Sequence, residues 1–306
     1  MAKKIITPDQ HEIVVKKEKV WTKHQIILTI VVLFFSLACL LPFVNVAAVS
    51  FSSKSAILRG IVSFWPVEFE TTAYKAIFAD SSMIRSLMFT IVITVVYTLF
   101  SMIMTILMAY PLTKKRLRGR NFFSLMALFT MYFSGGIIPH YVNIKELGIM
   151  NTPWALILPG MLSTYNMIIL KSFFQTLPNE LEEAAIIDGA TDFQVLIRIY
   201  LPLSMASIAT LTLFYAVGKW NSFQDGLFYI QDKNLQPLQL KLYNIIKGAQ
   251  AVDVAAMEGG SSTVATSISE SIRPATIIFA TLPILVVYPF VQRYFVAGVT
   301  IGAVKG

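Results

Sequence analysis

The chain contains six long stretches without a single Lys, Arg, Asp or Glu. They cover residues 25–53, 86–113, 121–144, 147–170, 199–218 and 274–292, and each is at least 19 residues long. A helix needs roughly 20 mainly apolar residues to cross the hydrocarbon core of a bilayer. Only 14% of all residues are charged, whereas a soluble domain carries about 25%. The sequence therefore predicts an all-α, polytopic membrane protein with six transmembrane helices.

The basic residues between these stretches predict the orientation. Segments on the side of the N-terminus carry 15 Lys and Arg residues, and segments on the other side carry 8. Because cytoplasmic loops are enriched in positive charge, both termini are predicted to be cytoplasmic. The strongest cluster is Lys114, Lys115, Arg116, Arg118 and Arg120. The net charge of +8 is thus explained by topology and anionic lipid, and no nucleic-acid partner is expected.

The predicted organisation is a charged N-terminal segment, residues 1–25, followed by a transmembrane domain over 26–306. Proline is expected to kink the fourth stretch at Pro159-Gly160 and to interrupt the sixth at Pro283 and Pro289. Two connections are too long to be simple turns. One is the cytoplasmic segment 178–202, and the other is an external loop, 221–274, in which LYNIIKGAQAVDVAAM is predicted to be helical.

The cytoplasmic segment 178–202 differs in composition from the rest of the chain. It holds five of the 17 acidic residues and a single basic one. The pattern predicts two short helices, the first with a capping box of Asn179 and Glu182, the second with a capping box of Thr191 and Gln194.

Gly189 separates the two predicted helices, and a glycine in left-handed conformation commonly ends a helix. The second helix has apolar residues at helical spacing on one side: Phe193, Leu196, Ile197 and Tyr200. Helices that lie on a bilayer are normally rich in Lys and Arg, unlike this acidic segment. It is therefore predicted to dock on a protein partner.

The same segment resembles the signature loop of ABC importer permeases. The residues that agree with the signature at fixed spacing are Glu183, Ala184, Ala185, Gly189, Ile199, Leu201 and Pro202. The six stretches, the place of the loop between the fourth and fifth, and the ending QRYFVAGVTIGAVKG are similar to carbohydrate permeases of the MalG type. The tracts NVAAVSFSSKSAILRGIVSFWPVEF and SIRPATIIFATLPILVVYPF further resemble the LplC/YtcP-like branch.

This resemblance implies a type I ABC importer permease fold, with 26–306 as the permease domain and 178–202 as the coupling loop. In the family this loop docks on a cytoplasmic ATPase subunit and passes its ATP-driven closure to the spans, which alternate between two open states. Phe193 and Leu196 are expected to fill the cleft of the ATPase, and Glu183 to hold the first helix or meet a partner group. The implied partners are a second homologous permease, two ABC ATPase subunits that carry ATP and Mg, and an extracellular sugar-binding protein. The expected location is the cell membrane of a prokaryote.

The sequence does not indicate an enzyme. The phosphate-binding pattern G-x-x-x-x-G-K-[ST] is absent, so ATP hydrolysis by that route needs a separate chain. The histidines, His11, His24 and His140, are scattered, and one cysteine cannot form a metal cluster. We expect no catalytic residue, metal site or cofactor in this chain.

Residues that contact the cargo are less constrained by the sequence. Sugars are held by aromatic faces and hydrogen-bonding side chains, although Trp and Tyr also serve as interfacial anchors. The candidates for the substrate pathway are Tyr165, Asn166, Trp220 and Asn221. The candidates for contact with the binding protein are Gly259, Gly260 and Ser261.

The predicted function is a permease subunit of an ATP-driven importer for oligosaccharides. An ABC permease for a non-sugar solute is an alternative, because peptide and amino-acid permeases share the signature loop. An ion-driven secondary transporter is a weaker alternative. Such transporters place ionisable groups near the membrane midplane, and Lys219, which follows the fifth stretch, is interpreted as a snorkelling side chain.

Overall fold

The computed structural model describes residues 3–6, 12–15, 22–257 and 271–289. This part of the chain is helical apart from a short antiparallel pair of strands, β1 (Lys3–Ile6) and β2 (Glu12–Val15), in which Lys3 lies opposite Val15. The shorter helices are α2 (Lys54–Leu58), α3 (Thr72–Ala79), α5 (Arg120–Tyr132), α6 (Ile137–Glu146), α7 (Trp154–Ile157) and α13 (Gln224–Tyr229).

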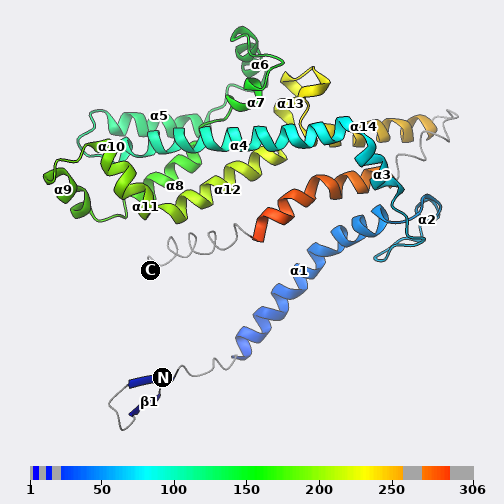
Figure 1. Cartoon of the computed structure of the whole chain (residues 1–306), viewed down its shortest axis with the longest axis horizontal. Coiled ribbons are helices and arrows are strands. Elements are labelled where there is room, and N and C mark those ends of the chain that lie inside the picture. The colour runs from blue at the N-terminus through cyan, green and yellow to red at the C-terminus, as the bar shows by residue number, and fades with distance from the viewer. Residues whose placement is uncertain (1–2, 7–11, 16–21, 258–270, 290–306) are drawn as a thin grey trace.

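Helix α4 (Ser81–Ala109) forms the axis of the packed region, with α8 (Thr164–Phe174), α12 (Met205–Asn221) and α14 (Leu238–Met257) packed against it (Figure 1). Its buried face carries a stripe of small hydroxyl side chains, Ser86, Thr90, Thr94, Thr98, Ser101 and Thr105. Small side chains let helix backbones approach closely within a membrane. The stripe therefore explains why other helices pack against α4 along its whole length.

Hydrogen bonds stabilise this packing at two places along α4. The hydroxyls of Thr105 and Tyr215 lie 2.7 Å apart, and the backbone N–H of Ser163 donates to the Tyr215 hydroxyl at 3.0 Å. Near the other end of α4, the N–H of Leu238 donates to Thr90 Oγ1 at 2.8 Å. The three helices α4, α8 and α12 thus meet at Tyr215.

Helix α1 (Lys23–Ser50) runs apart from the packed region (Figure 1). Its most apolar window is 0% buried against the rest of the chain, and its buried residues, Ala48 and Ser50, lie at its C-terminal end. The side-chain amide of Asn45 donates to the carbonyl of Ser63, and the Ser50 hydroxyl lies 2.8 Å from that of Tyr74. A helix that is apolar all round is suited to lipid.

Three described helical segments are long and apolar enough to cross a membrane: Lys23–Ser50, Ser81–Thr113 and Ser271–Pro289. The number rises to five if two bent pairs each count as one span. One pair is α5 with α6, which meet at 113°, and the other is the segment Asp192–Leu203 with α12, which meet at 83°. The fourth of the six predicted stretches does not form a single helix of spanning length.

The break in the fourth stretch falls at the predicted proline and glycine, but it is larger than a kink. Helix α7 ends at Ile157 and α8 begins at Thr164. Gly160 between them has φ +71°, and its carbonyl accepts a hydrogen bond from the Tyr97 hydroxyl at 2.8 Å. The chain therefore turns here instead of continuing as one rod.

The sixth stretch shows the opposite outcome. Pro283 was expected to interrupt it, yet the helix runs without a break through this residue, from Ser271 to Pro289. The prediction for Pro289 is not tested, because the residues that follow it lie outside the described ones. In a membrane protein, neighbouring groups can replace the one backbone hydrogen bond that a proline removes. The helix predicted in LYNIIKGAQAVDVAAM is confirmed as part of α14, and the glycine-rich tract that follows it lies outside the described residues.

Candidate functional site

The signature residues lie in a bent unit of residues 179–203, which we call the Gly189 elbow. It consists of α9 (Asn179–Ile187), a turn, and a helical segment made of α10 (Asp192–Val195), a π-helical turn (Leu196–Tyr200) and α11 (Leu201–Leu203). It connects α8 to α12 and projects beyond the end of α4 (Figure 1).

The turn of the elbow depends on a glycine. Gly189 has φ +84°, and a Cβ added there would meet nothing within 4 Å. Its N–H donates to the carbonyl of Ile186, and the N–H of Ala190 donates to that of Ala185. The sequence prediction is confirmed: the position needs glycine for its left-handed backbone conformation and not for space.

The two predicted capping boxes had different outcomes. Thr191 and Gln194 form the predicted box at the start of the second helix. The box predicted for Asn179 and Glu182 is wrong, because Pro178 occupies the N-cap position of α9 without a capping hydrogen bond and Asn179 is already the first helical residue. Glu182 is therefore free to make long-range contacts instead.

Glu182 receives two hydrogen bonds on the same carboxylate oxygen. Lys114, early in the loop that follows α4, places its Nζ 2.6 Å from Glu182 Oε2, and the Tyr200 hydroxyl donates to that atom at 2.7 Å. The Lys114 ammonium also lies 4.0 Å from the centre of the Tyr110 ring and 4.2 Å from that of Tyr200. This cation–π cage further stabilises the charge of a buried lysine.

The pKa values of the pair follow from this arrangement. Burial raises the pKa of Glu182, but the hydrogen bonds from Lys114 and Tyr200 outweigh burial and hold it below its ordinary value. Burial lowers the pKa of Lys114, and pairing with Glu182 opposes that shift only in part. Glu182 is therefore an ionised acceptor at neutral pH.

A second ion pair joins the same loop to the other half of the elbow. Arg116 contacts the carboxylate of Asp192, and the Tyr110 hydroxyl donates to the Asp192 carbonyl at 3.1 Å. Basic residues that the sequence indicated as topology anchors thus also bind the elbow. Sequence analysis missed the pairs because Lys114 and Glu182 are 68 positions apart.

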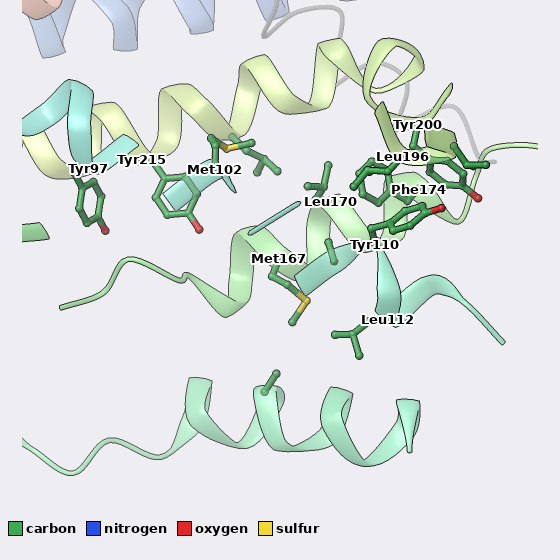
Figure 2. Close-up of a cluster of buried hydrophobic side chains, with 14 residues drawn as sticks. Tyr97, Met102, Tyr110, Leu112, Met167, Leu170, Phe174, Leu196, Tyr200 and Tyr215 are labelled. Atoms are coloured by element: carbon green, nitrogen blue, oxygen red, sulfur yellow. The ribbon is translucent and has the colours of Figure 1, made fainter. Parts of the chain in front are cut away.

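Three aromatic rings pack edge to face beneath the elbow: Tyr110 from the end of α4, Phe174 from α8 and Tyr200 from the elbow (Figure 2). Their ring centres lie 5.1 to 6.4 Å apart. Each such pair adds about 0.5–1.5 kcal/mol beyond area burial. The rings therefore fix the elbow to both helices at once.

Leu196 packs into this same cluster and is 4% exposed (Figure 2). The expectation that it fills a cleft of a partner is wrong, because its side chain already lies inside this chain. Phe193, by contrast, is 63% exposed, and Ile187, which the sequence analysis did not single out, is 85% exposed. We call these two side chains the apolar tip of the elbow.

The remaining signature residues divide between surface and interior. Glu183 and Ala184 are exposed on α9, and Pro202 is exposed near the end of the elbow. Ala185, Ile199 and Leu201 are partly buried and pack against the aromatic cluster. The signature thus supplies both the outer surface of the elbow and its attachment.

The four predicted pathway residues do not line one cavity. Trp220 is buried among residues of α3, α4 and α14, and its indole N–H donates to the Ala280 carbonyl. Asn166 is buried on α8, whereas Tyr165 and Asn221 are exposed. Gly259, Gly260 and Ser261, predicted to contact the binding protein, lie outside the described residues.

A cavity of about 400 Å³ lies beside the C-terminal end of α12 instead. Its lining comes from α4, α6, α12, α13 and the loop at Gly160, and includes Tyr97, His140, Lys219 and Asp225. Lys219 does not snorkel as the sequence analysis interpreted it. Its ammonium is buried, lies 2.9 Å from Asp225 Oδ2 and stands 4.8 Å from the centre of the Tyr97 ring.

Comparison with known proteins then decides the family. The profile described as "Binding-protein-dependent transport system inner membrane component" matches residues 76–301, which include both the elbow and the cavity. The chain belongs to this family. The permease is thus a transport component and not an enzyme, as predicted, and a prokaryotic multi-pass membrane protein.

Individual relatives cover almost the whole permease. It is 44% identical over 267 residues to Protein LplC of Bacillus subtilis (strain 168). This alignment covers 87% of the permease and 90% of LplC. The permease is 40% identical over 277 residues to the polygalacturonan/rhamnogalacturonan transport system permease protein YtcP of the same strain, with 90% and 95% covered. Both confirm the predicted resemblance.

Solved structures agree with the fold. A chain of a bacterial ABC transporter involved in the import of the acidic polysaccharide alginate superposes with a TM-score of 0.79 at 29% identity. The match covers 90% of the permease and 99% of that chain. It confirms the predicted ABC importer permease fold.

Proposed function

We propose that the permease imports oligosaccharides as one subunit of an ATP-driven transporter, and that the Gly189 elbow is its docking site for an ATPase subunit. The observation that carries this proposal is the contrast within the elbow. Its apolar tip, Ile187 and Phe193, is exposed, while Leu196 and Tyr200 fix the base to α4 and α8.

To pass on the movement of a docked subunit, the elbow needs both a surface that binds the subunit and a rigid attachment to the membrane helices. Fully burying a large apolar side chain against a partner contributes about 1.5–3 kcal/mol, so the apolar tip can serve as the binding surface. The ion pairs of Lys114 and Arg116 and the three edge-to-face rings prevent the elbow from turning independently of the bundle. Movement of a docked subunit would therefore pass to α4, α8 and α12 as a rigid-body displacement.

The proposed assembly contains a second homologous permease, two ABC ATPase subunits that bind ATP and Mg, and an extracellular sugar-binding protein. The elbow and both termini lie on the cytoplasmic side in this proposal, as the basic loops favour. The family description, binding-protein-dependent transport, supports a binding-protein partner. The cell membrane supplies the bilayer for the long apolar helices.

The proposed cargo rests on the relatives. YtcP is described as a polygalacturonan/rhamnogalacturonan permease, a 27% identical relative from Halalkalibacterium halodurans as an arabinooligosaccharide permease, and the structural match as part of an alginate importer. All three names describe saccharides. A non-sugar solute is the alternative cargo.

The docking proposal is tested by capture of the ATPase. The permease would be expressed with its partner subunits in its native membrane, solubilised in mild detergent and recovered by a tag, and the ATPase that comes with it would be quantified. Phe193→Glu should reduce capture strongly, because loss of an apolar anchor at the centre of a docking face costs about 2 kcal/mol or more and the new carboxylate would be buried without a partner. Ile187→Glu should do the same.

The matched control is Phe64→Glu, at another exposed phenylalanine on the external loop. It should leave ATPase capture unchanged. Equal capture by wild type and both tip variants would refute docking at the elbow. Uptake assays with labelled oligosaccharides and with amino acids or peptides then decide the cargo, and transport of only the latter would refute the sugar assignment.

A further inference from the structure

The cavity beside α12 is lined by an ion pair between a buried lysine, Lys219, and a partly exposed aspartate, Asp225, and both have unfilled hydrogen-bonding capacity. An ammonium group has three N–H donors, and among the described residues Asp225 is the one hydrogen-bond acceptor of Lys219. Lys219 and Ser222 both donate to Oδ2 of Asp225, and no described residue donates to Oδ1. Buried polar groups normally have their partners satisfied, so the buried Lys219 ammonium in the wall of the cavity points to a ligand.

The surroundings of the pair restrict the kind of ligand. An anion would be attracted by Lys219 but repelled by Asp225, and a cation would meet the reverse. An apolar solute would leave the remaining N–H donors of Lys219 and the Oδ1 atom of Asp225 without partners, which is costly. A hydroxyl group both donates and accepts, so two neighbouring hydroxyls can bind the ammonium and the carboxylate together.

The rest of the lining suits a ring that carries such hydroxyls. Phe228 and Tyr229 add aromatic surface, and His140 and Gln224 add further hydrogen-bonding groups. A volume of about 400 Å³ lies within the roughly 300–1,000 Å³ typical of small-molecule sites.

We propose that this cavity is a subsite for one pyranose residue of the transported oligosaccharide, with Lys219 and Asp225 binding two vicinal hydroxyls. The inference rests on the proposed function and adds to it the location of a contact and its chemistry. Vicinal hydroxyls occur in neutral sugars and in uronates alike. The experiment therefore compares two trisaccharides of the same stereochemistry, galactotriose and trigalacturonate.

The test is protection of a cysteine at the rim of the cavity. The single cysteine, Cys39, would be replaced by alanine, and Gln224→Cys would be introduced at an exposed position of the lining. The matched control is Gln231→Cys, which is also exposed but does not line the cavity. The complete importer in nanodiscs, with its binding protein and a non-hydrolysable ATP analogue, would be treated with a thiol reagent with and without each trisaccharide.

The transported trisaccharide should slow modification of Gln224→Cys about tenfold, as expected for hydrogen bonds to charged groups, and leave Gln231→Cys unaffected. Adding Lys219→Met or Asp225→Asn should abolish the protection. Variants that no longer co-purify with the ATPase are replaced by Ser222→Ala, which should reduce the protection by removing the second donor to Asp225.

Protection by galactotriose alone, trigalacturonate alone or both would each support the subsite and identify the sugar class. Equal protection of both cysteines, or protection that survives Lys219→Met and Asp225→Asn, would overturn it. Absence of protection in an importer that takes up a trisaccharide in liposomes would overturn the subsite and leave the proposed function standing. Failure to take up any saccharide would instead overturn the proposed function.

Discussion

The ammonium of Lys114 lies 2.6 Å from the carboxylate of Glu182, which joins the loop after α4 to the first helix of the Gly189 elbow. Both side chains are largely shielded from solvent, and Tyr200 adds a hydrogen bond to the same oxygen. The pair therefore links a membrane helix directly to the surface proposed to receive the ATPase.

Breaking this pair should weaken the coupling between ATP hydrolysis and transport. Lys114→Met leaves Glu182 partly buried with one donor, and such a loss costs about 1–3 kcal/mol. We expect ATPase subunits to stay bound through the apolar tip, while the amount of oligosaccharide imported per ATP hydrolysed falls. The ratio is measured in proteoliposomes.

Lys115→Met is the matched control, since Lys115 is exposed in the same loop. It should leave the ratio unchanged. Equal ratios for the two variants would show that the Lys114–Glu182 pair plays no part in coupling.

An added side chain has room at Gly189, but an L-residue there should strain the left-handed backbone conformation. Gly189→Ala is expected to destabilise the permease by about 1–2 kcal/mol, because an L-residue at φ +84° is strained. Gly189→Asn should cost less, since asparagine adopts this conformation more readily. Thermal unfolding in detergent provides the measurement.

A helical glycine in open space provides the comparison. Gly248→Ala, in α14, should stabilise the protein by about 0.5–1 kcal/mol. A Gly189→Ala protein as stable as wild type would mean that the turn is not constrained as described.

The hydroxyl stripe of α4 should contain both dispensable and essential members. Thr98 Oγ1 is buried without a hydrogen-bond partner among the described residues, so Thr98→Val should be neutral or stabilising. Thr105 bonds to the Tyr215 hydroxyl, and Thr105→Val should destabilise the permease by about 1 kcal/mol. Similar melting temperatures for the two variants would argue against the Thr105–Tyr215 bond.

The Glu182 carboxylate should also give the stability a pH dependence. Its pKa in the folded state is below its ordinary value of 4.5, so the folded state holds fewer protons than the unfolded state in that range. The stabilisation is complete above 4.5 and is lost as the pH falls through the lowered pKa. The melting-temperature difference between wild type and Glu182→Gln should therefore shrink on acidification, and a constant difference would contradict this.

The sequence predicted local features better than pairings. Gly189 and the Thr191–Gln194 box depend on backbone preferences within a few residues, and both were found as expected. The partners of Glu182 and Lys219 were not predicted, because the pairing of charged side chains depends on tertiary packing. Asp225 lies only six residues from Lys219, yet a charged residue at the end of an apolar stretch looks the same whether it reaches water or closes an internal pair.

The helical breaks were predictable only in part. Pro159-Gly160 combines a missing donor with a left-handed glycine, and together they turn the chain. Pro283 alone does not. A proline is therefore a weaker sign of a break in a membrane helix than a proline followed by a glycine in the left-handed region.

Helix α1 is mechanically a cantilever. It is held at its C-terminal end, where Asn45 and Ser50 bond to the loop and helix that follow, and its most apolar window is unburied. Its tilt and lateral position are therefore not set by packing against the rest of the described residues. They are set by whatever lipid or subunit surrounds it in the assembled transporter, so the same sequence can fit neighbours of different shape without refolding the bundle around α4.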